Sequence, residues 1–358
     1  MCVTATDKPD TSESPKSGVC EQTAFAEAGL VRIAVFGGGA WGTALAVAFA
    51  RVHEVTLWAR DTAAVQAMEA ERSNRRYLPG VAFPDRLRVS ADFTETARGA
   101  GLHLVVTPLA GLRATLRALR ELVPGTPLIW ACKGLEAETG RLPHEIVRAE
   151  LGTDAACGVL TGPSFAAEVG AGMPTAVTLA SADRAFAEHW LQVLHQPRFR
   201  IYSNTDLVGA EVGGGLKNVI AIASGVSDGM GFGLNARAAL ITRGLAEITR
   251  LGVALGARPE TLMGLTGMGD LILTCTGDLS RNRRVGLALA EGKSLPTILA
   301  ELGHVAEGVP TARAALRLAS TKGVEMPITE AIDALLHSDG IGPRDAVELL
   351  LSREPRHE

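Results

Sequence analysis

Residues 31–42, VRIAVFGGGAWG, decide the fold of this chain. The apolar run VRIAVF has the composition of a buried strand and ends directly in glycines. Gly37, Gly39 and Gly42 then form the pattern G-x-G-x-x-G, where an Ala-rich, helix-favouring segment begins. In this context the first glycine permits a tight turn, the second lets the backbone approach a pyrophosphate, and the third lets strand and helix pack closely. The pattern predicts a dinucleotide held at a helix N-terminus, and the alternative is a glycine-rich turn without a ligand.

The end of the second expected strand, residues 55–58, distinguishes two dinucleotides. An acidic side chain there favours the ribose 2′-hydroxyl of NAD, whereas an arginine suits the 2′-phosphate of NADP. Arg60 follows this strand and favours NADP. The adjacent Asp61 keeps NAD open as the alternative.

Outward from this stretch, strand-like and helix-like segments alternate up to about residue 202, which predicts a mostly parallel sheet covered on both faces. Residues 212–255 are rich in Ala, Gly, Ile and Leu and predict one long buried helix. We therefore expect an α/β protein with an N-terminal Rossmann-type doubly wound sheet, residues 31–205, and a C-terminal all-α domain, residues 206–358. Residues 1–30 are rich in Ser, Thr, Pro and charge and predict a disordered tail. The expected strands are residues 31–36, 55–58, 86–89, 102–107, 128–131, 158–161 and 175–179.

Composition excludes several classes of protein. The 35 Lys and Arg against 39 Asp and Glu give a net charge of −4, so no global basic field attracts nucleic acid. No apolar run reaches the roughly 18–20 residues that span a bilayer, and residues 1–30 lack the apolar core of a secretory signal. Five scattered cysteines without a CxxC pair indicate a reducing compartment and no metal site. We expect a cytoplasmic protein, without a membrane span, that acts on a small molecule.

Lysine is rare, with six among the 35 basic residues, so two lysines in apolar, Gly-rich settings are informative. Unlike arginine, a desolvated lysine lowers its pKa and can exchange a proton. Lys217 follows three glycines and precedes a buried helical pattern, and Lys133 ends a sheet strand, where ligands of open α/β folds collect. The alternative for each is an ordinary lysine whose amine reaches solvent.

Three further segments suit an anionic substrate. The turn TGPSFA, residues 161–166, exposes backbone N–H groups and a hydroxyl. Asp270 lies in the Gly-rich turn GMGD, where a carboxylate can orient an ammonium or accept a hydroxyl proton. The segment SRNRR, residues 280–284, combines guanidinium, amide and a helix start, and phosphate is the natural anion for that combination. A surface basic cluster is the alternative for SRNRR.

Taken together, these segments resemble one family, the bacterial NAD(P)-dependent glycerol-3-phosphate dehydrogenases. The resemblance covers about residues 31–352, and its motifs are VFGGGAWGTALA, LWARD, WACKGLEAETG, TGPSFAAE, GGLKNVIAIASGVSDGMGFGLNARAALITRGLAE, GMGDLILTC, SRNRR and EMPITE. It implies reversible hydride transfer between a nicotinamide and C2 of a three-carbon phosphate. sn-Glycerol 3-phosphate and dihydroxyacetone phosphate would be interconverted, supplying phospholipid synthesis, by an enzyme that we expect to be a homodimer.

The resemblance also implies a role for individual residues. The lysine matching Lys217 would be the proton acceptor, with Lys133 and Asp270 holding the hydroxyls and polarising the carbonyl. We assign to the substrate site Gly162, Ser164, Thr274, Ser280, Arg281 and Asn282. We assign to the cofactor site Gly37, Gly39, Ala40, Trp41, Gly42, Arg60, Lys133, Ala166, Arg281, Val305 and Glu307.

The chain departs from the family pattern at two positions. Ala40 stands where relatives often carry a serine that contacts the cofactor, and Leu109 stands where they often carry Ser or Thr. Neither change touches the expected proton acceptor. Two rival functions remain: a 6-phosphogluconate-type dehydrogenase, against which TGPSFAAE and SRNRR argue, and a catalytically silent nucleotide sensor, which would have lost these charged residues.

Overall fold

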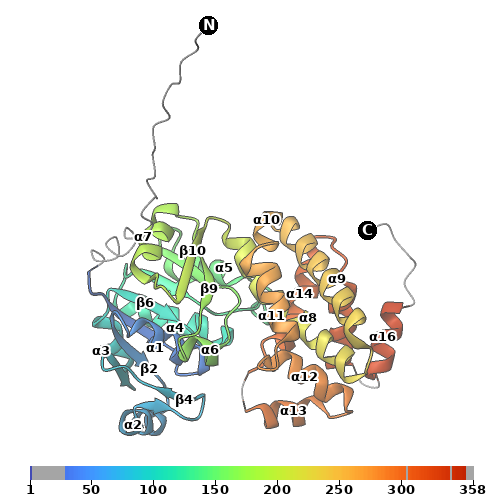
Figure 1. Ribbon diagram of the computed structural model, residues 1–358, viewed down its shortest axis with the longest axis horizontal. Coiled ribbons are helices and arrows are strands. Elements are labelled where there is room, and N and C mark those ends of the chain that lie inside the picture. Colours follow the sequence, from blue (N-terminus) through green and yellow to red (C-terminus); the bar gives the residue numbers. More distant parts are fainter. Residues whose placement is uncertain (2–28, 304, 339–340, 352–358) are drawn as a thin grey trace.

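Two structural units lie side by side in the computed structural model, a sheet covered by helices and a bundle made of helices alone (Figure 1). The structure describes residues 1, 29–303, 305–338 and 341–351. The expected disordered tail, residues 1–30, therefore falls almost entirely outside the described residues. No helix in the described part of the chain is both long enough and apolar enough to cross a membrane.

The larger sheet has eight strands in the order β10-β9-β8-β7-β6-β1-β2-β5. All neighbouring strands are parallel except β8 and β9, which are antiparallel. A small antiparallel pair, β3 (Ser73–Asn74) and β4 (Leu78–Ala82), lies outside it. The strands of the larger sheet are β1 (Arg32–Phe36), β2 (Glu54–Trp58), β5 (Leu87–Ser90), β6 (Leu102–Val105), β7 (Leu128–Trp130), β8 (Cys157–Thr161), β9 (Thr175–Ala180) and β10 (Phe199–Asn204).

Both faces of this sheet are buried, as the near-continuous apolar strands predict. In β1, Ile33 and Val35 pack with α1 (Ala40–Phe49) and α7 (Arg184–Leu194), whereas Ala34 and Phe36 pack with α4 (Leu109–Leu122) and α5 (Pro143–Leu151). Side chains that alternate along one strand thus feed two separate cores, which confirms the doubly wound Rossmann-type architecture. The remaining helices of this unit are α2 (Thr62–Glu71), α3 (Phe93–Arg98) and α6 (Ala166–Gly170).

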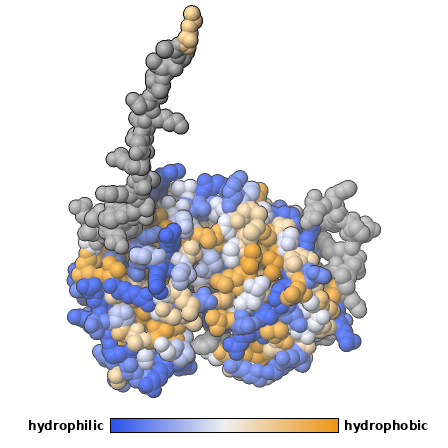
Figure 2. All heavy atoms as spheres, viewed as in Figure 1, coloured by the Kyte–Doolittle hydropathy of each residue, from blue (hydrophilic) through white to orange (hydrophobic). Residues whose placement is uncertain are grey.

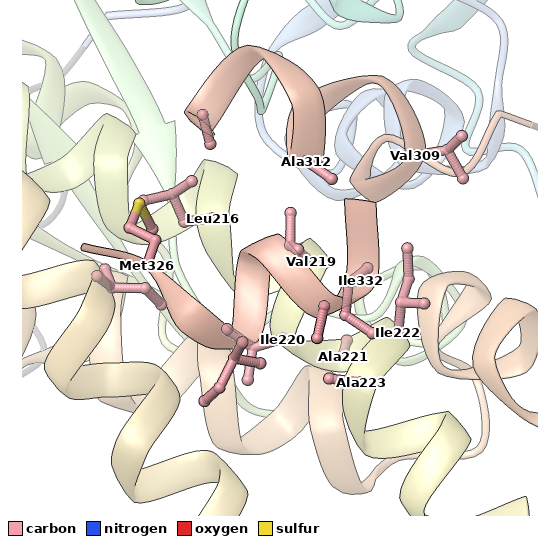
Figure 3. Packing of buried hydrophobic residues seen from close by; sticks show 14 of the residues in the cluster. Leu216, Val219, Ile220, Ala221, Ile222, Ala223, Val309, Ala312, Met326 and Ile332 are labelled. Atoms are coloured by element: carbon pink, nitrogen blue, oxygen red, sulfur yellow. The ribbon is translucent and has the colours of Figure 1, made fainter. Parts of the chain in front are cut away.

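The helical unit is built around α8 (Leu207–Gly229), whose residues are buried along almost the whole helix. Figure 3 shows its side chains Val219 and Ile222 packed among residues of α14 (Gly308–Thr321) and α15 (Pro327–His337). A helix that is apolar on every side needs partners all round, and its neighbours supply them. The other helices are α9 (Gly233–Ala254), α10 (Pro259–Leu262), the π-helix η1 (Leu265–Gly269), α11 (Asp270–Thr276), α12 (Arg281–Ala290), α13 (Leu295–Leu302) and α16 (Pro343–Leu351).

Two expectations are corrected here. The single long helix expected over residues 212–255 is two helices, α8 and α9, because Gly231 and Gly233 adopt positive φ angles of 74° and 81° that end one helix and turn the chain before the next. The edge strand β10 lies outside the strands expected from the sequence, and only Phe199 and Ile201 among its residues are buried. The division of the chain at residues 205 and 206 stays a prediction.

Candidate active site

Three glycines shape the loop after β1. Gly37 and Gly42 lie too close to neighbouring backbone for a side chain, whereas Gly39 borders open space. Gly37 has a φ of +133°, and an added Cβ would lie 2.6 Å from the carbonyl oxygen of Val106. A Cβ on Gly42 would collide with the carbonyl oxygen of Gly37. Gly39 differs, because an added Cβ would meet no heavy atom of the described residues within 4 Å. The backbone of Gly39 therefore borders open space.

Helix α1 begins directly after this loop, with Ala40 and Trp41 in its first turn. No side chain among the described residues caps its N-terminus at Gly39. The first N–H groups of a helix lack partners within the helix and attract anions. An uncapped helix start beside open space is the arrangement that a dinucleotide pyrophosphate requires, so these residues fit the expected cofactor.

Arg60 and Asp61, which follow β2, have different surroundings. Asp61 is the N-cap of α2, where its Oδ1 accepts hydrogen bonds from the backbone N–H groups of Ala63 at 3.0 Å and Ala64 at 3.2 Å. Arg60 is exposed. The carboxylate is thus engaged in holding a helix, while the guanidinium can meet a ribose 2′-phosphate.

A cluster of charged side chains joins the two structural units. Lys217, in the middle of α8, donates hydrogen bonds to Asp270 Oδ1 and, at 2.8 Å, to the hydroxyl of Thr274. Lys133, beyond the end of β7, donates to Asp270 Oδ2 at 2.6 Å. Asp270 is 1% exposed and Lys217 is 7% exposed. Two amines from different units therefore share one buried carboxylate.

Burial controls the protonation of Lys217. Desolvation lowers the pKa of this amine to about 7; the carboxylate of Asp270 opposes the shift, and the positive charge of Lys133 adds to it. A lysine with this pKa exchanges a proton near neutral pH, whereas an exposed lysine stays protonated. The cluster can therefore act as a general acid or base.

Three consecutive glycines on α8 allow this cluster to assemble. An added Cβ on Gly213 would lie 2.6 Å from the carbonyl oxygen of Thr266, just before Asp270. One on Gly214 would lie 2.6 Å from the hydroxyl of Thr161. One on Gly215 would lie 3.1 Å from the backbone of Gly134, beside Lys133. Each glycine thus lets α8 approach a different segment, and two of these segments carry charged residues of the cluster.

The turn after β8 lies beside Lys133. Gly162 has a φ of +140°, which favours glycine, and its carbonyl oxygen accepts hydrogen bonds from Ser164 Oγ at 3.1 Å and Lys133 Nζ at 3.5 Å. Ala166 begins the short helix that follows. The structure therefore brings Gly162 and Ser164 to the lysine–aspartate cluster, as expected from the sequence.

The N-terminus of α12 lies against α8. Ser280 is its N-cap and accepts a hydrogen bond from the backbone N–H of Arg283. An added Cβ on Gly286 of α12 would collide with the carbonyl oxygen of Ile222 on α8, and one on Gly225 of α8 would collide with the backbone of Arg283. The two helices thus touch backbone to backbone.

The residues expected to hold the phosphate occupy the first turn of α12. Arg281 is exposed, and Asn282 is 8% exposed. Asn282 Oδ1 accepts a hydrogen bond from the backbone N–H of Gly308 at 3.0 Å, and its Nδ2 donates to Asn218 at 2.9 Å. The guanidinium is therefore the more accessible of the two side chains.

Glu307 connects the helical unit to helix α4 of the sheet unit. Its Oε1 accepts a hydrogen bond from the backbone N–H of Leu109, at the start of α4, at 3.3 Å. Burial raises the pKa of its carboxyl group, and this hydrogen bond and the charge of Arg281 oppose the shift. Val305, two residues earlier, is 45% exposed. Glu307 thus lies between the expected phosphate site and the loop side of the sheet.

The recorded side-chain contacts unite Lys133, Lys217, Asp270 and Thr274 and extend to Gly162 and Ser164. Among the described residues, no side-chain hydrogen bond or ion pair joins Trp41, Arg60 or Val305 to this cluster. The sequence did not indicate that Thr161 lies against Gly214, or that Asn218 and Gly308 are hydrogen-bonded to Asn282. The glycine run before Lys217 indicated close packing but did not indicate its partners.

A Rossmann-type loop that fits a dinucleotide and a buried lysine whose pKa lies near 7 are together typical of a nicotinamide-dependent dehydrogenase. Comparison with known proteins specifies the class. Residues 32–187 match the N-terminal domain of NAD-dependent glycerol-3-phosphate dehydrogenase, and residues 206–348 match its C-terminal domain. The chain belongs to this family.

Individual relatives agree with this assignment. Glycerol-3-phosphate dehydrogenase [NAD(P)+] of Aromatoleum aromaticum is 71% identical over 92% of this chain and 100% of its own length. The protein of the same description from Dechloromonas aromatica is 58% identical over 92% of this chain and 99% of its own. The crystal structure of glycerol-3-phosphate dehydrogenase from Coxiella burnetii superposes with a TM-score of 0.86 at 42% identity, covering 90% of this chain and 99% of that one.

Proposed function

We propose that this protein interconverts sn-glycerol 3-phosphate and dihydroxyacetone phosphate, with NADP(H) as the preferred cofactor and NAD(H) as the alternative. The observation that carries the proposal is the buried Lys217 amine, bonded to Asp270 and Thr274, with a pKa of about 7. Family membership supports the reaction and the dependence on NAD(P). In the reductive direction the enzyme would supply glycerol 3-phosphate for phospholipid synthesis.

Lys217 is the acid–base group of this proposal. In oxidation its neutral amine takes the proton of the C2 hydroxyl, and in reduction its ammonium returns that proton to the carbonyl oxygen. Because the pKa lies at about 7, both protonation states are populated at neutral pH. Asp270 and Thr274 accept hydrogen bonds from the amine and thereby fix its position. Lys133, with Asp270, orients the substrate hydroxyls and polarises the carbonyl.

The phosphate is assigned to the start of α12. Arg281 would pair with it, the N–H groups of the first helical turn that Ser280 does not cap would face it, and Ser280 and Asn282 would complete the site. The hydroxyl of Ser164 and the backbone of Gly162 line the other side. Binding energy at the phosphate, remote from C2, then serves to orient the reacting carbon.

The bound nicotinamide supplies or accepts the hydride at its C4. The glycine loop and the first turn of α1 would hold the dinucleotide, and Arg60 would pair with its 2′-phosphate. Support for this placement is the open space beside Gly39 and the uncapped helix start. The cofactor residues proposed are Gly37, Gly39, Ala40, Trp41, Gly42, Arg60, Lys133, Ala166, Arg281, Val305 and Glu307.

A direct absorbance assay of NADPH or NADH oxidation tests the function. The purified protein is given dihydroxyacetone phosphate with NADPH or NADH, and cofactor oxidation is followed at both ends of the neutral pH range. We expect turnover with both cofactors and a higher kcat/KM with NADPH. Reduction of NADP+ by 6-phosphogluconate, together with no oxidation of NADPH by dihydroxyacetone phosphate, would contradict the proposal, and so would binding of NADPH without any turnover.

A homodimer in the cytoplasm completes the proposal. Figure 2 shows apolar residues gathered over the α10–α11 part of the helical unit, where Met263 is 55% exposed and Ile272 is 45% exposed. Such a surface suits a second copy of the chain. Light scattering of the purified protein should give twice the chain mass, and cell fractionation should place it with the cytosolic enzymes. A monomeric mass at micromolar concentration would overturn the dimer.

A further inference from the structure

Three buried residues of the helical unit, Asn218, Asn282 and Gly308, form a hydrogen-bonded group that we call the asparagine cluster. Asn282 Oδ1 accepts from the backbone N–H of Gly308 at 3.0 Å, and Asn282 Nδ2 donates to Asn218 Oδ1 at 2.9 Å. Asn218 is 6% exposed and Asn282 is 8% exposed. The cluster joins the three helices α8, α12 and α14.

The chemistry of the donors fixes the orientation of both amides. A backbone N–H can only donate, so the Asn282 atom that faces Gly308 is its oxygen. The other end of that amide is then the NH₂ group, which requires an oxygen from Asn218. Neither amide can flip without breaking a buried hydrogen bond. The cluster therefore has one arrangement.

Gly308 lies in close contact with both asparagines of the cluster. An added Cβ would lie 2.6 Å from the carbonyl oxygen of Asn218 and 2.9 Å from Asn282 Oδ1. A glycine is thus required for α14 to begin this close to α8 and α12. Even a methyl group here would push the three helix segments apart.

Each member of the cluster directly follows a residue of the proposed site in the sequence. Asn218 follows Lys217, the proton-transfer group, and Asn282 follows Arg281, the phosphate group. Gly308 follows Glu307, which accepts a hydrogen bond from Leu109 at the start of α4 and is assigned to the cofactor. One buried cluster thus holds the backbone of three functional residues that are far apart in the chain.

We propose that the asparagine cluster is a positioning device that sets the places of Lys217, Arg281 and Glu307 together, so that its residues act on cofactor binding, phosphate binding and proton transfer at once. The proposal rests on the proposed function, because those three roles belong to it. Asn218 and Gly308 are then positioning residues. The Asn282 side chain acts mainly through its two neighbours, whatever contact its remaining N–H makes with the phosphate.

The test compares Asn218→Ala, Asn282→Ala and the double variant in three measurements. These are the Kd for NADPH by fluorescence titration without substrate, the KM for dihydroxyacetone phosphate, and the pH midpoint of kcat. We expect each single variant to raise both the Kd and the KM about fivefold or more and to displace the pH midpoint. The double variant should be no worse than the poorer single variant, because both lose the same connection.

Further variants separate positioning from general damage. Gly308→Ala should likewise raise the Kd for NADPH and the KM and displace the pH midpoint, because its Cβ would collide with Asn218 and Asn282. Gly101→Ala, where an added Cβ meets only ordinary contacts at 3.9 Å, should match the parent protein. Asn218→Asp retains the acceptor oxygen and should restore most of the NADPH affinity. If Asn218→Ala does not fold, as judged by circular dichroism, Gly308→Ala and Asn218→Asp carry the same comparison.

Several results would overturn the proposal. If Asn282→Ala raised only the KM and Asn218→Ala changed nothing, Asn282 would be a simple phosphate ligand. Additive effects in the double variant would also refute the shared connection. A parent protein that does not turn over dihydroxyacetone phosphate would refute the proposed function instead, and the NADPH titrations would still decide whether the cluster positions Glu307.

Discussion

Helix α8 buries two charged side chains, Glu211 and Lys217, and treats them differently. The Glu211 carboxylate accepts hydrogen bonds from the indole N–H of Trp130 at 3.0 Å and the backbone N–H of His144 at 2.8 Å, and its other oxygen lies 2.5 Å from His144 Nδ1. Lys217 instead shares the carboxylate of Asp270 with Lys133. Glu211 has hydrogen-bond donors that it shares with no other carboxylate among the described residues, whereas Lys217 shares its carboxylate partner, Asp270, with Lys133.

This difference separates a structural charge from a reactive one. Glu211 joins α8 to β7 and to the start of α5. Burial raises the pKa of its carboxyl group, and the hydrogen bonds from His144 and Trp130 oppose that shift. In the other cluster Lys133 and Asp270 balance each other, and Lys217 has no carboxylate to itself. Its proton is therefore the one that the site can release and take back.

The largest expected effect comes from breaking the reactive cluster. Lys217→Ala should lower kcat by about 10²–10⁴-fold, because general acid–base assistance is lost, while the Kd for NADPH stays at the parent value. Glu211→Gln is the matched control on the same helix and should retain kcat. Steady-state kinetics and fluorescence titration check both. An equal loss of kcat in the two variants would contradict the assignment of Glu211 as structural and Lys217 as reactive.

The next effect concerns the approach of α8 to the sheet. Gly214→Ala should lower kcat/KM by about 10²-fold, since its Cβ would meet the Thr161 hydroxyl and displace Lys217 from Lys133. Adding Thr161→Ala removes the obstructing oxygen and should restore most of the activity. Adding Thr161→Val keeps an atom of similar size there and should not. Rescue by valine as well would show that the hydroxyl is not the obstacle.

The pH dependence should change in a defined direction. Oxidation of sn-glycerol 3-phosphate requires neutral Lys217, so kcat should rise with pH through about 7, the pKa of this amine. Lys133→Met removes a neighbouring positive charge that lowers this pKa, so the midpoint should move upward by on the order of one pH unit. A pH–rate profile of the two proteins provides the measurement. A midpoint that moves downward would show that Lys133 does not act on Lys217 through its charge.

The smallest expected effect lies at the other end of the cofactor. Arg60→Asp should lower the ratio of kcat/KM with NADPH to that with NADH by about tenfold, because a charge-assisted contact with the 2′-phosphate is replaced by repulsion. The kcat with saturating NADH should stay close to the parent value, since the hydrogen-bond partners of Lys217 are Asp270 and Thr274 and not Arg60. Kinetics with both cofactors measure the ratio. An unchanged ratio would remove Arg60 from the cofactor site.

The sequence predicted those features that depend on residues close together in the chain. The strand–glycine–helix arrangement around Gly37 is local, because backbone geometry over a few residues decides it. The identity of Lys217 as a candidate also came from local context, a rare lysine in an apolar setting. The fold class follows from the same local patterns, summed along the chain.

Contacts between distant residues could not be predicted in this way. Asp270 lies 53 positions from Lys217, and only tertiary packing brings their side chains together. The partners of the asparagine cluster are likewise separated by 64 and 26 positions. The break between α8 and α9 depends on two glycines that take positive φ angles, a choice which the helix-like composition on either side concealed.

The backbone contact between α8 and α12 has a consequence for motion. Lys217 and Arg281 lie on helices that touch at Gly225 and Gly286, so the groups proposed for proton transfer and phosphate binding belong to one closely packed block. Lys133 and Gly162 belong to the other unit, and a hinge between the units would part them from Asp270 without changing the spacing of Lys217 and Arg281. We expect amide hydrogen exchange in the free protein to be slow and concerted across α8 and α12, with faster exchange at the turn around Gly162.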